Sequence, residues 1–398
     1  MNSKKISKNI IVLSIVSLLN DISSEMVYPV VPIFLTSVLG VPANIIGLIE
    51  GLADASSKIL MSVSGYISDK FHKRKLFVEV GYSFAAFSHL ILAVSNSWPL
   101  VLFSRVLNRS GKGLRTAARD AIITESTDKE SRGFSFGFHR TMDGLGGVIG
   151  PLLAVLLMGL FANNYKLLFI LAFIPASIGA LVIFFFVSDK KRAPGDDLTM
   201  KFDWGKTSSS FRIFLLISFI FAIGNSSDAF LILRSQNLGL SVSLTIFAYV
   251  IFNFVSSVFS LPAGMLADKF GPKKIIFIGF VIFSFVYWCF GWTNSASVVW
   301  ILFPIYGVFM ALTEGVSKAY ISKLVPHEIS ASTFGIYQTA MGIATLIAST
   351  VAGTLWSSFG PKTPFYFGSV MALIAAILFL SLSKNIKAQQ NQFISPVS

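Results

Sequence analysis

Charged residues are scarce in this chain, and cysteine and histidine are scarcer. Only 13% of the 398 residues are charged, against about 25% in a typical soluble domain, which disfavours a protein that folds alone in water. The single cysteine, Cys289, excludes an internal disulfide and a cysteine-bound metal cluster. The four histidines are widely spaced, and the phosphate-binding pattern Gly-x4-Gly-Lys-Ser/Thr does not occur. We therefore expect no metal, no cofactor and no ATP-driven step, and no grouping of a nucleophile with a base suggests an enzyme.

Apolar residues, in contrast, fill 54% of the chain and include 39 phenylalanines. A helix of about 20 apolar residues crosses the hydrocarbon core of a bilayer. The sequence contains twelve segments of this kind, which predict an all-α membrane protein with twelve transmembrane helices. The predicted spans are residues 9–36, 43–69, 75–95, 98–125, 131–160, 165–188, 211–234, 242–267, 274–292, 297–324, 331–357 and 363–383.

The net charge of +13 is concentrated on one side of this twelve-span arrangement. Basic clusters fall near both chain ends, at the midpoint, and in the loops after the second and eighth spans, whereas the loops at Gly40, Ser97 and Thr293 carry almost no charge. Lysine and arginine accumulate in cytoplasmic loops, so we expect a multi-pass protein of the cell inner membrane with both termini in the cytoplasm. This distribution suits a lipid bilayer and argues against a nucleic-acid partner.

One segment of the sequence occurs twice, 199 residues apart, which is half the chain length. Residues 65–75, GYISDKFHKRK, are matched by residues 264–274, GMLADKFGPKK. Many secondary transporters use two similar halves to build a binding site that can open to either side. The predicted parts are an N-terminal six-helix bundle over 1–188, a cytoplasmic linker over 189–210, a C-terminal six-helix bundle over 211–384 and a disordered cytoplasmic tail over 385–398.

The repeated segment carries the loop motif Gly-x-x-x-Asp-Lys/Arg-x-Gly-Arg/Lys-Lys, and with it the whole chain resembles the major facilitator superfamily. The first copy has His72 at the glycine position, and the second copy is closer to the motif. The resemblance implies an alternating-access transporter in which two pseudo-symmetric bundles enclose a central cavity. It also implies that the acid of the motif helps to hold the outward-open state. The conformational-switch residues predicted in the two copies are Gly65, Asp69, Arg74, Gly264 and Asp268.

Span 5 offers a second comparison with the family. Its antiporters carry Gly-x8-Gly-x3-Gly-Pro-x-x-Gly-Gly there, and Gly137, Gly146, Gly150 and Pro151 keep this spacing, although the last two glycines are replaced. The resemblance implies export by exchange, and we add Gly146, Gly150 and Pro151 to the predicted switch residues. Close packing of a neighbouring helix is the alternative role for these glycines.

Acidic residues in the first two spans are candidate proton sites. Asp21 and Glu25 lie near the middle of span 1, one helical turn apart on one face. Two close carboxylates in a low dielectric repel each other, which favours a proton on one of them. We therefore predict proton coupling through Asp21, Glu25 and, in span 2, Asp54. The alternatives are static ion pairs with a neighbouring helix for the first two, and local pairing with Lys58 for Asp54.

Span 4 carries a ladder of basic residues that cannot face lipid. Arg105, Arg109, Lys112 and Arg119 fall on one helix face, with Arg115 beside them. The ladder either pairs with the acids of spans 1 and 2 or contacts an anionic group of the solute. The candidate solute-binding residues of both halves are Arg105, Arg109, Arg115, Asp228, Glu314 and Tyr337. Since the second half has fewer charges, we expect coupling to reside in the first half and the second half to form the opposing wall.

These features predict a monomeric transporter that exports a small organic solute by antiport with protons. One alternative is a proton-coupled uptake symporter, or an exchanger, for an organic anion that the arginines of span 4 would hold. Another is a membrane sensor or assembly partner that transports nothing.

Overall fold

The computed structural model describes residues 7–71, 73–128, 131–187, 207–325 and 330–393, and it describes their side chains except at positions 66, 69–71, 330–332 and 382–393. The helices of the first half are α1 (Lys8–Val27), α2 (Val31–Ser37), α3 (Ala43–Phe71), α4 (Arg74–Ala93), α5 (Trp98–Glu125), α6 (Arg132–Leu160) and α7 (Tyr165–Phe186). Those of the second half are α8 (Ser209–Gly224), α9 (Ala229–Asn237), α10 (Val242–Phe270), α11 (Pro272–Trp292), α12 (Val299–Leu324), α13 (Ser330–Phe359) and α14 (Thr363–Phe393).

Two of the twelve predicted spans are broken helices. Span 1 consists of α1 and α2, and the break includes Pro29, which lacks the amide hydrogen that a continuous helix needs. Pro32 lies in the first turn of α2, where that hydrogen has no partner within the helix. Span 7 is divided into α8 and α9 at residues 225–228, where the Ser227 hydroxyl accepts a bond from the amide of Ala229. Corresponding helices of the two halves are therefore interrupted.

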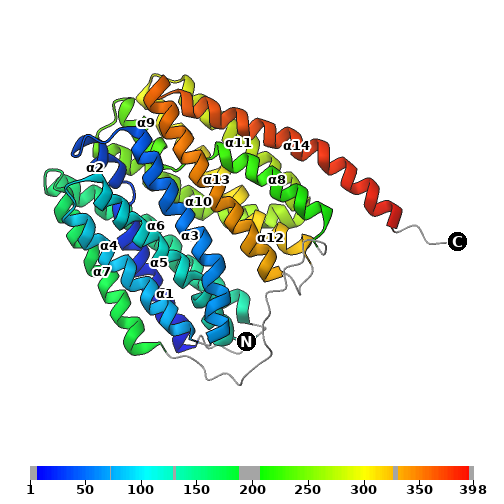
Figure 1. Ribbon diagram of the computed structural model, residues 1–398, viewed down its shortest axis with the longest axis horizontal. Coiled ribbons are helices and arrows are strands. Elements are labelled where there is room, and N and C mark those ends of the chain that lie inside the picture. Colours follow the sequence, from blue (N-terminus) through cyan, green and yellow to red (C-terminus); the bar gives the residue numbers. More distant parts are fainter. Residues whose placement is uncertain (1–6, 72, 129–130, 188–206, 326–329, 394–398) are drawn as a thin grey trace.

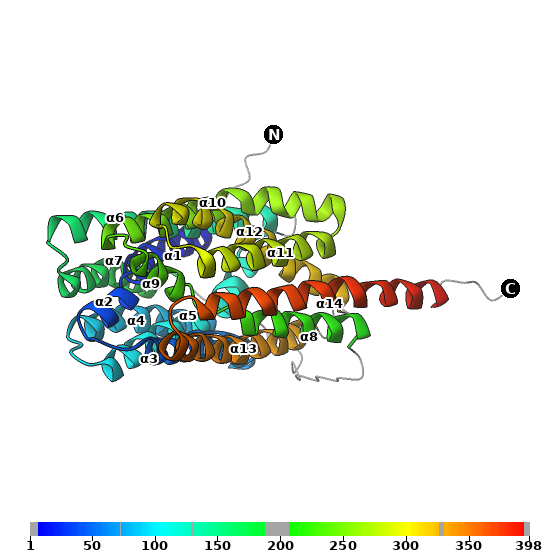
Figure 2. The ribbon, with the colours of Figure 1, turned by 90° about the horizontal axis from the view of Figure 1, so that it is seen from above.

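The two sets of helices form neighbouring bundles that meet along two helix pairs. Figure 2 shows α3 beside α13 and α6 beside α10, and both pairs are in contact. The short helices α2 and α9 touch at one end of the molecule (Figure 1). The positive-inside pattern predicts that this end is the outer one.

Glycines hold α3 and α13 close together at that end. A Cβ atom added to Gly47 would overlap the backbone of Ser349, and one added to Gly353 would overlap the backbone of Ala43. The backbone amide of Asn44 also donates to the hydroxyl of Ser357 over 3.1 Å. Small residues permit this close approach of two membrane helices, so the bundles are tightly joined there.

The core of the second bundle is rich in aromatic rings. Phe221 stacks on Phe280 with ring centroids 4.0 Å apart, and Phe283 stacks on Tyr287 at 3.9 Å. Both rings of the second pair are fully buried. Offset and edge-on ring contacts stabilise a core beyond the area that they bury, so this bundle is held mainly by apolar packing.

The ends of the described helices bear on the predicted linker and the predicted tail. The predicted linker over 189–210 lies largely outside the described residues, and α8 already begins at Ser209. The tail over 385–398 was predicted to be disordered, but α14 continues to Phe393, so this prediction was wrong for residues 385–393. Lysine, alanine and glutamine are good helix formers, and they extend the helix beyond the last apolar residues.

Candidate functional site

Two helices differ from the others in composition. In the described part of the chain, ten helical segments are long and apolar enough to cross a membrane. The two remaining spans, α3 and α5, are of similar length but carry several charged side chains each. They pack against each other, so the charges that make each helix polar are brought together.

A bidentate ion pair joins these two helices. The Nε and Nη2 atoms of Arg105 donate to the two carboxylate oxygens of Glu50 over 2.9 and 2.6 Å. The side chains are only 5% and 1% exposed. This geometry is the strongest form of a carboxylate–guanidinium contact. Arg105, predicted to bind solute, is thus occupied by an acid that was not selected as a site residue.

The next arginine on α5 also pairs with an acid of α3. Arg109 pairs with Asp54, with 3.2 Å between Nε and the nearer carboxylate oxygen. The guanidinium groups of Arg105 and Arg109 both lie over the ring of Tyr28, 5.2 and 5.1 Å from its centroid. Asp54 therefore pairs with α5 rather than with Lys58, and Tyr28 lies against both arginines at the break between α1 and α2.

Asp21 and Glu25 have different surroundings. Among the described residues, no lysine or arginine nitrogen lies within 4.0 Å of either carboxylate. Asp21 accepts a 3.4 Å hydrogen bond from the side-chain amide of Asn20, and Glu25 accepts a 3.0 Å hydrogen bond from the hydroxyl of Tyr249 on α10. The two acids of span 1 are thus held by neutral donors.

The glycines of span 5 lie directly behind these two acids. A Cβ atom on Gly146 would come within 2.7 Å of the Cβ of Asp21, and one on Gly150 within 2.9 Å of the amide of Met26. Pro151 is buried inside α6. These three predicted switch residues therefore bring the backbone of α6 against the acidic face of α1.

The predicted site residues of the second half have different neighbours. Asp228, at the break before α9, accepts a 2.7 Å bond from the hydroxyl of Tyr306. Glu314 is 47% exposed and lies 3.6 Å from Arg140 of α6 and 3.4 Å from Lys318. Tyr337 is partly buried and stacks on Phe214 with 6.0 Å between centroids. Only Glu314 among them forms an ion pair with the first bundle.

Arg115 packs on a ring of α4 rather than on Tyr28. It is 4% exposed, and its guanidinium lies 4.5 Å from the centroid of the Tyr82 ring of α4. It is buried within the first bundle, whereas Lys112, one turn earlier on α5, is exposed.

The two loop-motif copies differ in their contacts. In the first, Arg74 binds Glu125 over 2.6 Å, and a Cβ on Gly65 would meet Ala117 at 3.2 Å. The side chain of Asp69 lies outside the described residues. In the second, Asp268 is 83% exposed and lies 3.8 Å from Lys323, while Gly264 faces open space. The first copy is therefore the more firmly tied to its own bundle.

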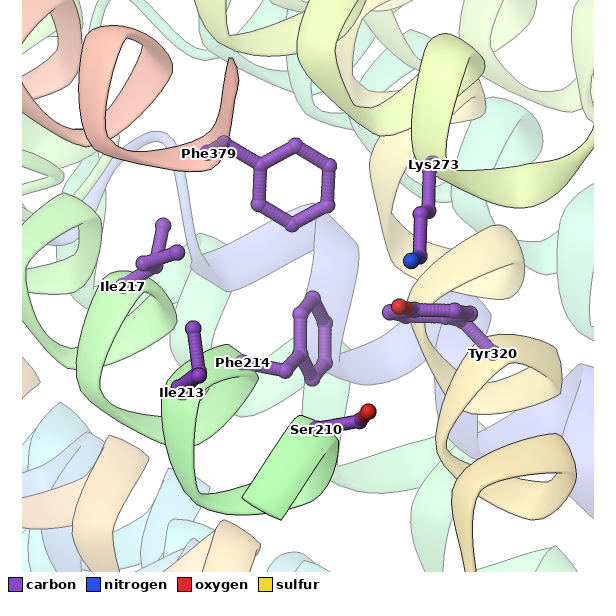
Figure 3. Close-up of a pocket in the computed structure, with 7 residues that line it drawn as sticks. All are labelled: Ser210, Ile213, Phe214, Ile217, Lys273, Tyr320 and Phe379. Carbon is purple, nitrogen blue, oxygen red and sulfur yellow. The ribbon is translucent and has the colours of Figure 1, made fainter. Parts of the chain in front are cut away.

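Two small cavities lie near these residues. One is lined by side chains of α1, α4 and α5, including His89, Arg105 and Asn108. The other lies between helices of the second bundle and is mainly aromatic and aliphatic, with the ammonium of Lys273 beside the ring of Tyr320 (Figure 3). In the described part of the chain, no three His, Cys, Asp or Glu side chains are grouped so that they could hold a metal ion.

Tyr28, Tyr249 and Glu50 are the contact residues that the sequence analysis missed. Glu50 and Asp54 are spaced by four residues, as are Arg105 and Arg109, and this matched spacing is a signal that could have predicted the pairing. The two tyrosines lie in apolar segments and give no such signal.

Comparison with known proteins identifies the family of the chain. The family model of the Major Facilitator Superfamily matches residues 13–233 and 213–395. An uncharacterised MFS-type transporter of Methanocaldococcus jannaschii is 37% identical over 387 residues, covering 95% of this chain and 96% of that protein. The class H tetracycline resistance protein of Pasteurella multocida is 23% identical over 399 residues, covering 94% and 95% of the two chains. The crystal structure of a D-xylose-proton symporter has the same fold, with a TM-score of 0.75 at 17% identity over 94% of this chain and 96% of that one. The protein therefore belongs to the Major Facilitator Superfamily of membrane transporters.

Proposed function

We propose that this transporter exports a small organic solute in exchange for protons, with Asp21 and Glu25 as the proton-binding groups. The observation that carries the proposal is the contrast between two pairs of acids. Glu50 and Asp54 each have an arginine partner, whereas Asp21 and Glu25 have none within 4.0 Å among the described residues. A carboxylate without a fixed cation can exchange a proton at lower cost than one locked in an ion pair.

The arrangement of the arginines favours this function over uptake of an organic anion. A site that binds an organic anion through arginine needs guanidinium N–H groups that are not already bound to another side chain. Both donors of Arg105 that face α3 bind Glu50, and Arg109 pairs with Asp54. A solute anion would first have to displace a buried carboxylate, which would leave that acid unpaired at a large cost in free energy.

The exposed charges support a path from the cytoplasm. Glu314 and Arg140 approach each other across the two bundles and are 47% and 65% exposed. An ion pair exposed to hydrocarbon would be costly, so we assign water to the space between the bundles at this level. At the end with α2 and α9, in contrast, glycines pack the bundles together. We therefore take this conformation to be inward-open, with both termini in the cytoplasm.

The similarity to a tetracycline resistance protein agrees with export but does not define the solute. The protein would bind its solute from the cytoplasm between the carboxylates of the first bundle and the residues of the second bundle that face them, such as Tyr249. An amphipathic molecule that carries a hydrogen-bond donor or a positive group matches these surroundings.

The proposal can be tested in proteoliposomes with an acidic lumen, which stands for the outside of the cell. The vesicles are incubated with a small-molecule extract of cells that express the protein, and mass spectrometry records which solutes accumulate. We expect accumulation that collapses when the gradient is removed and that is lost in Asp21→Asn and Glu25→Gln. Glu79→Gln, which alters an acid on α4 paired with Lys75, is the matched control and should retain accumulation. Accumulation that is indifferent to the gradient would refute proton coupling.

A further inference from the structure

The two helix breaks meet across the two bundles. The hydroxyls of Tyr28, at the first break, and Ser227, at the second, lie 3.2 Å apart. The ring of Tyr28 also packs on that of Tyr249, with 5.7 Å between centroids. These contacts lie next to α2 and α9, at the end where the bundles are joined. Any outward opening has to separate them.

The bond between Tyr249 and Glu25 is the contact in this group that depends on charge. The Tyr249 hydroxyl donates to a Glu25 carboxylate oxygen over 3.0 Å, and Tyr249 is only 4% exposed. A hydrogen bond to an ionised acceptor is roughly twice as strong as one between neutral groups. A proton on Glu25 removes that charge and weakens the bond between the bundles.

Several other charged or titratable groups surround Glu25. Groups close enough to interact with it electrostatically, directly or through Asp21, are Asp21, Tyr28, Arg109, Lys112, Arg115, Asp143, Asp228 and Tyr249. The one charged residue of α7, Lys166, binds Asn96 at the outer end instead. The three cations come from α5 and belong to the same bundle as Glu25. The Tyr249 hydroxyl is the donor that the second bundle supplies to this acid in the described part of the chain.

We propose that Tyr249 is a positioning residue that locks the empty, ionised carrier in the inward-open state by binding Glu25. A proton on Glu25 releases the lock, and so does a solute whose donor or positive group takes the place of the tyrosine hydroxyl. This inference rests on the proposed antiport.

The lock supplies a condition that antiport requires. A carrier that exchanges two solutes must change conformation with either one bound but not when empty, since an empty carrier that switches freely dissipates the gradient. A single bond that either ligand can break satisfies this condition. The ligand shifts the equilibrium because it binds the released state better than the locked one.

The test measures opening of the outer side without any solute. Ala43 lies in the outer contact between α3 and α13 and is buried, so Ala43→Cys, in a Cys289→Ala background, reports opening through its reaction with a maleimide. The protein is placed in lipid nanodiscs at acidic and alkaline pH. Each rate is divided by that of Val38→Cys, whose side chain is already 51% exposed, to correct for ionisation of the thiol.

We expect slow labelling at alkaline pH that rises about tenfold on acidification, the change that corresponds to loss of one charge-assisted hydrogen bond. Tyr249→Phe and Glu25→Gln should label rapidly at both pH values. Tyr165→Phe, which alters an aromatic residue that packs on Phe34 at the same end, should behave as the parent protein. Glu25→Gln keeps the test decisive if Tyr249→Phe does not fold.

Two outcomes separate the inference from the proposed function. If Tyr249→Phe keeps slow labelling and a normal response to pH, the lock is refuted even when gradient-driven accumulation persists. If the lock behaves as expected but accumulation ignores the gradient, the antiport is wrong and Tyr249 acts on gating alone.

Discussion

The two bundles share a fold and a repeated motif but are stabilised by different interactions. The first contains paired ladders of charge on α3 and α5, whereas the second is built around stacked aromatic rings. Charged groups can bind and release protons, and stacked rings cannot. The difference therefore separates the roles of the halves. The first would carry coupling, and the second would move as a rigid body against it.

The largest expected effect follows from removing one charge of the buried pair. Glu50→Gln leaves Arg105 buried without a counter-charge, and breaking such a pair costs about 3–5 kcal/mol. We expect a strong loss of thermal stability in detergent, measured by unfolding of the purified protein. The double change Glu50→Gln with Arg105→Gln should recover part of it. Equal stability of Glu50→Gln and the parent protein would show that the first bundle does not depend on its charges.

A second change acts on the contact between the bundles. Gly47→Ala places a methyl group against the Ser349 backbone, and overpacking of this kind costs about 1–3 kcal/mol. We expect lower stability and faster labelling of an outer cysteine reporter, because the two bundles are pushed apart. Gly147→Ala, at a position with no atom within 4 Å of the added carbon, is the control. The tight outer contact would be in doubt if both variants behaved alike.

A third change tests the aromatic core. Phe221→Leu removes a ring that stacks on Phe280 at 4.0 Å, and we expect a loss of about 1 kcal/mol, as for a typical core substitution. Dependence of transport on the pH gradient should be unchanged. Phe185→Leu, at a side chain that is 70% exposed on α7, should alter neither property. Loss of gradient dependence in Phe221→Leu alone would mean that coupling extends into the second bundle.

The smallest effect is expected in the second copy of the loop motif. Asp268 is 83% exposed and 3.8 Å from Lys323, and substitutions at exposed sites usually change stability by less than about 0.5 kcal/mol. Asp268→Asn should therefore unfold at nearly the temperature of the parent protein. Arg74→Gln, which removes the 2.6 Å contact with Glu125, should unfold at a lower temperature. If Asp268→Asn unfolded at a lower temperature than Arg74→Gln, the second copy of the motif would contribute more to stability than the first.

Much of the fold could be predicted from the sequence. Apolar runs of the right length and a repeat at half the chain length defined twelve spans, because lipid restricts a crossing segment to few structures. Pro29 could have indicated the break in span 1. The break at residues 225–228 contains no proline, but its asparagine, two serines and aspartate favour turns over helix interiors and could also have indicated a break. The helical end of α14 was missed because its polar residues were interpreted as a disordered tail.

The candidate site was predicted in composition but not in pairing. Asp21, Glu25, Asp54 and the arginines of α5 were selected, since a charge in a membrane segment is conspicuous, whereas Glu50 was not. Their partners depend on the relative height and rotation of separate helices, which one sequence does not define. Tyr28 and Tyr249 carry no charge, and their importance appears only where the bundles meet.

Infrared difference spectroscopy of the protein in lipid tests the central claim, that Asp21 and Glu25 bind the coupling proton. A carboxylic acid absorbs separately from a carboxylate, so a change from alkaline to acidic buffer should produce a protonated-acid band. We expect Asp21→Asn, Glu25→Gln or both to remove that band, and Asp54→Asn to leave it. A band that is unchanged in Asp21→Asn and Glu25→Gln, and lost in Asp54→Asn, would contradict the account.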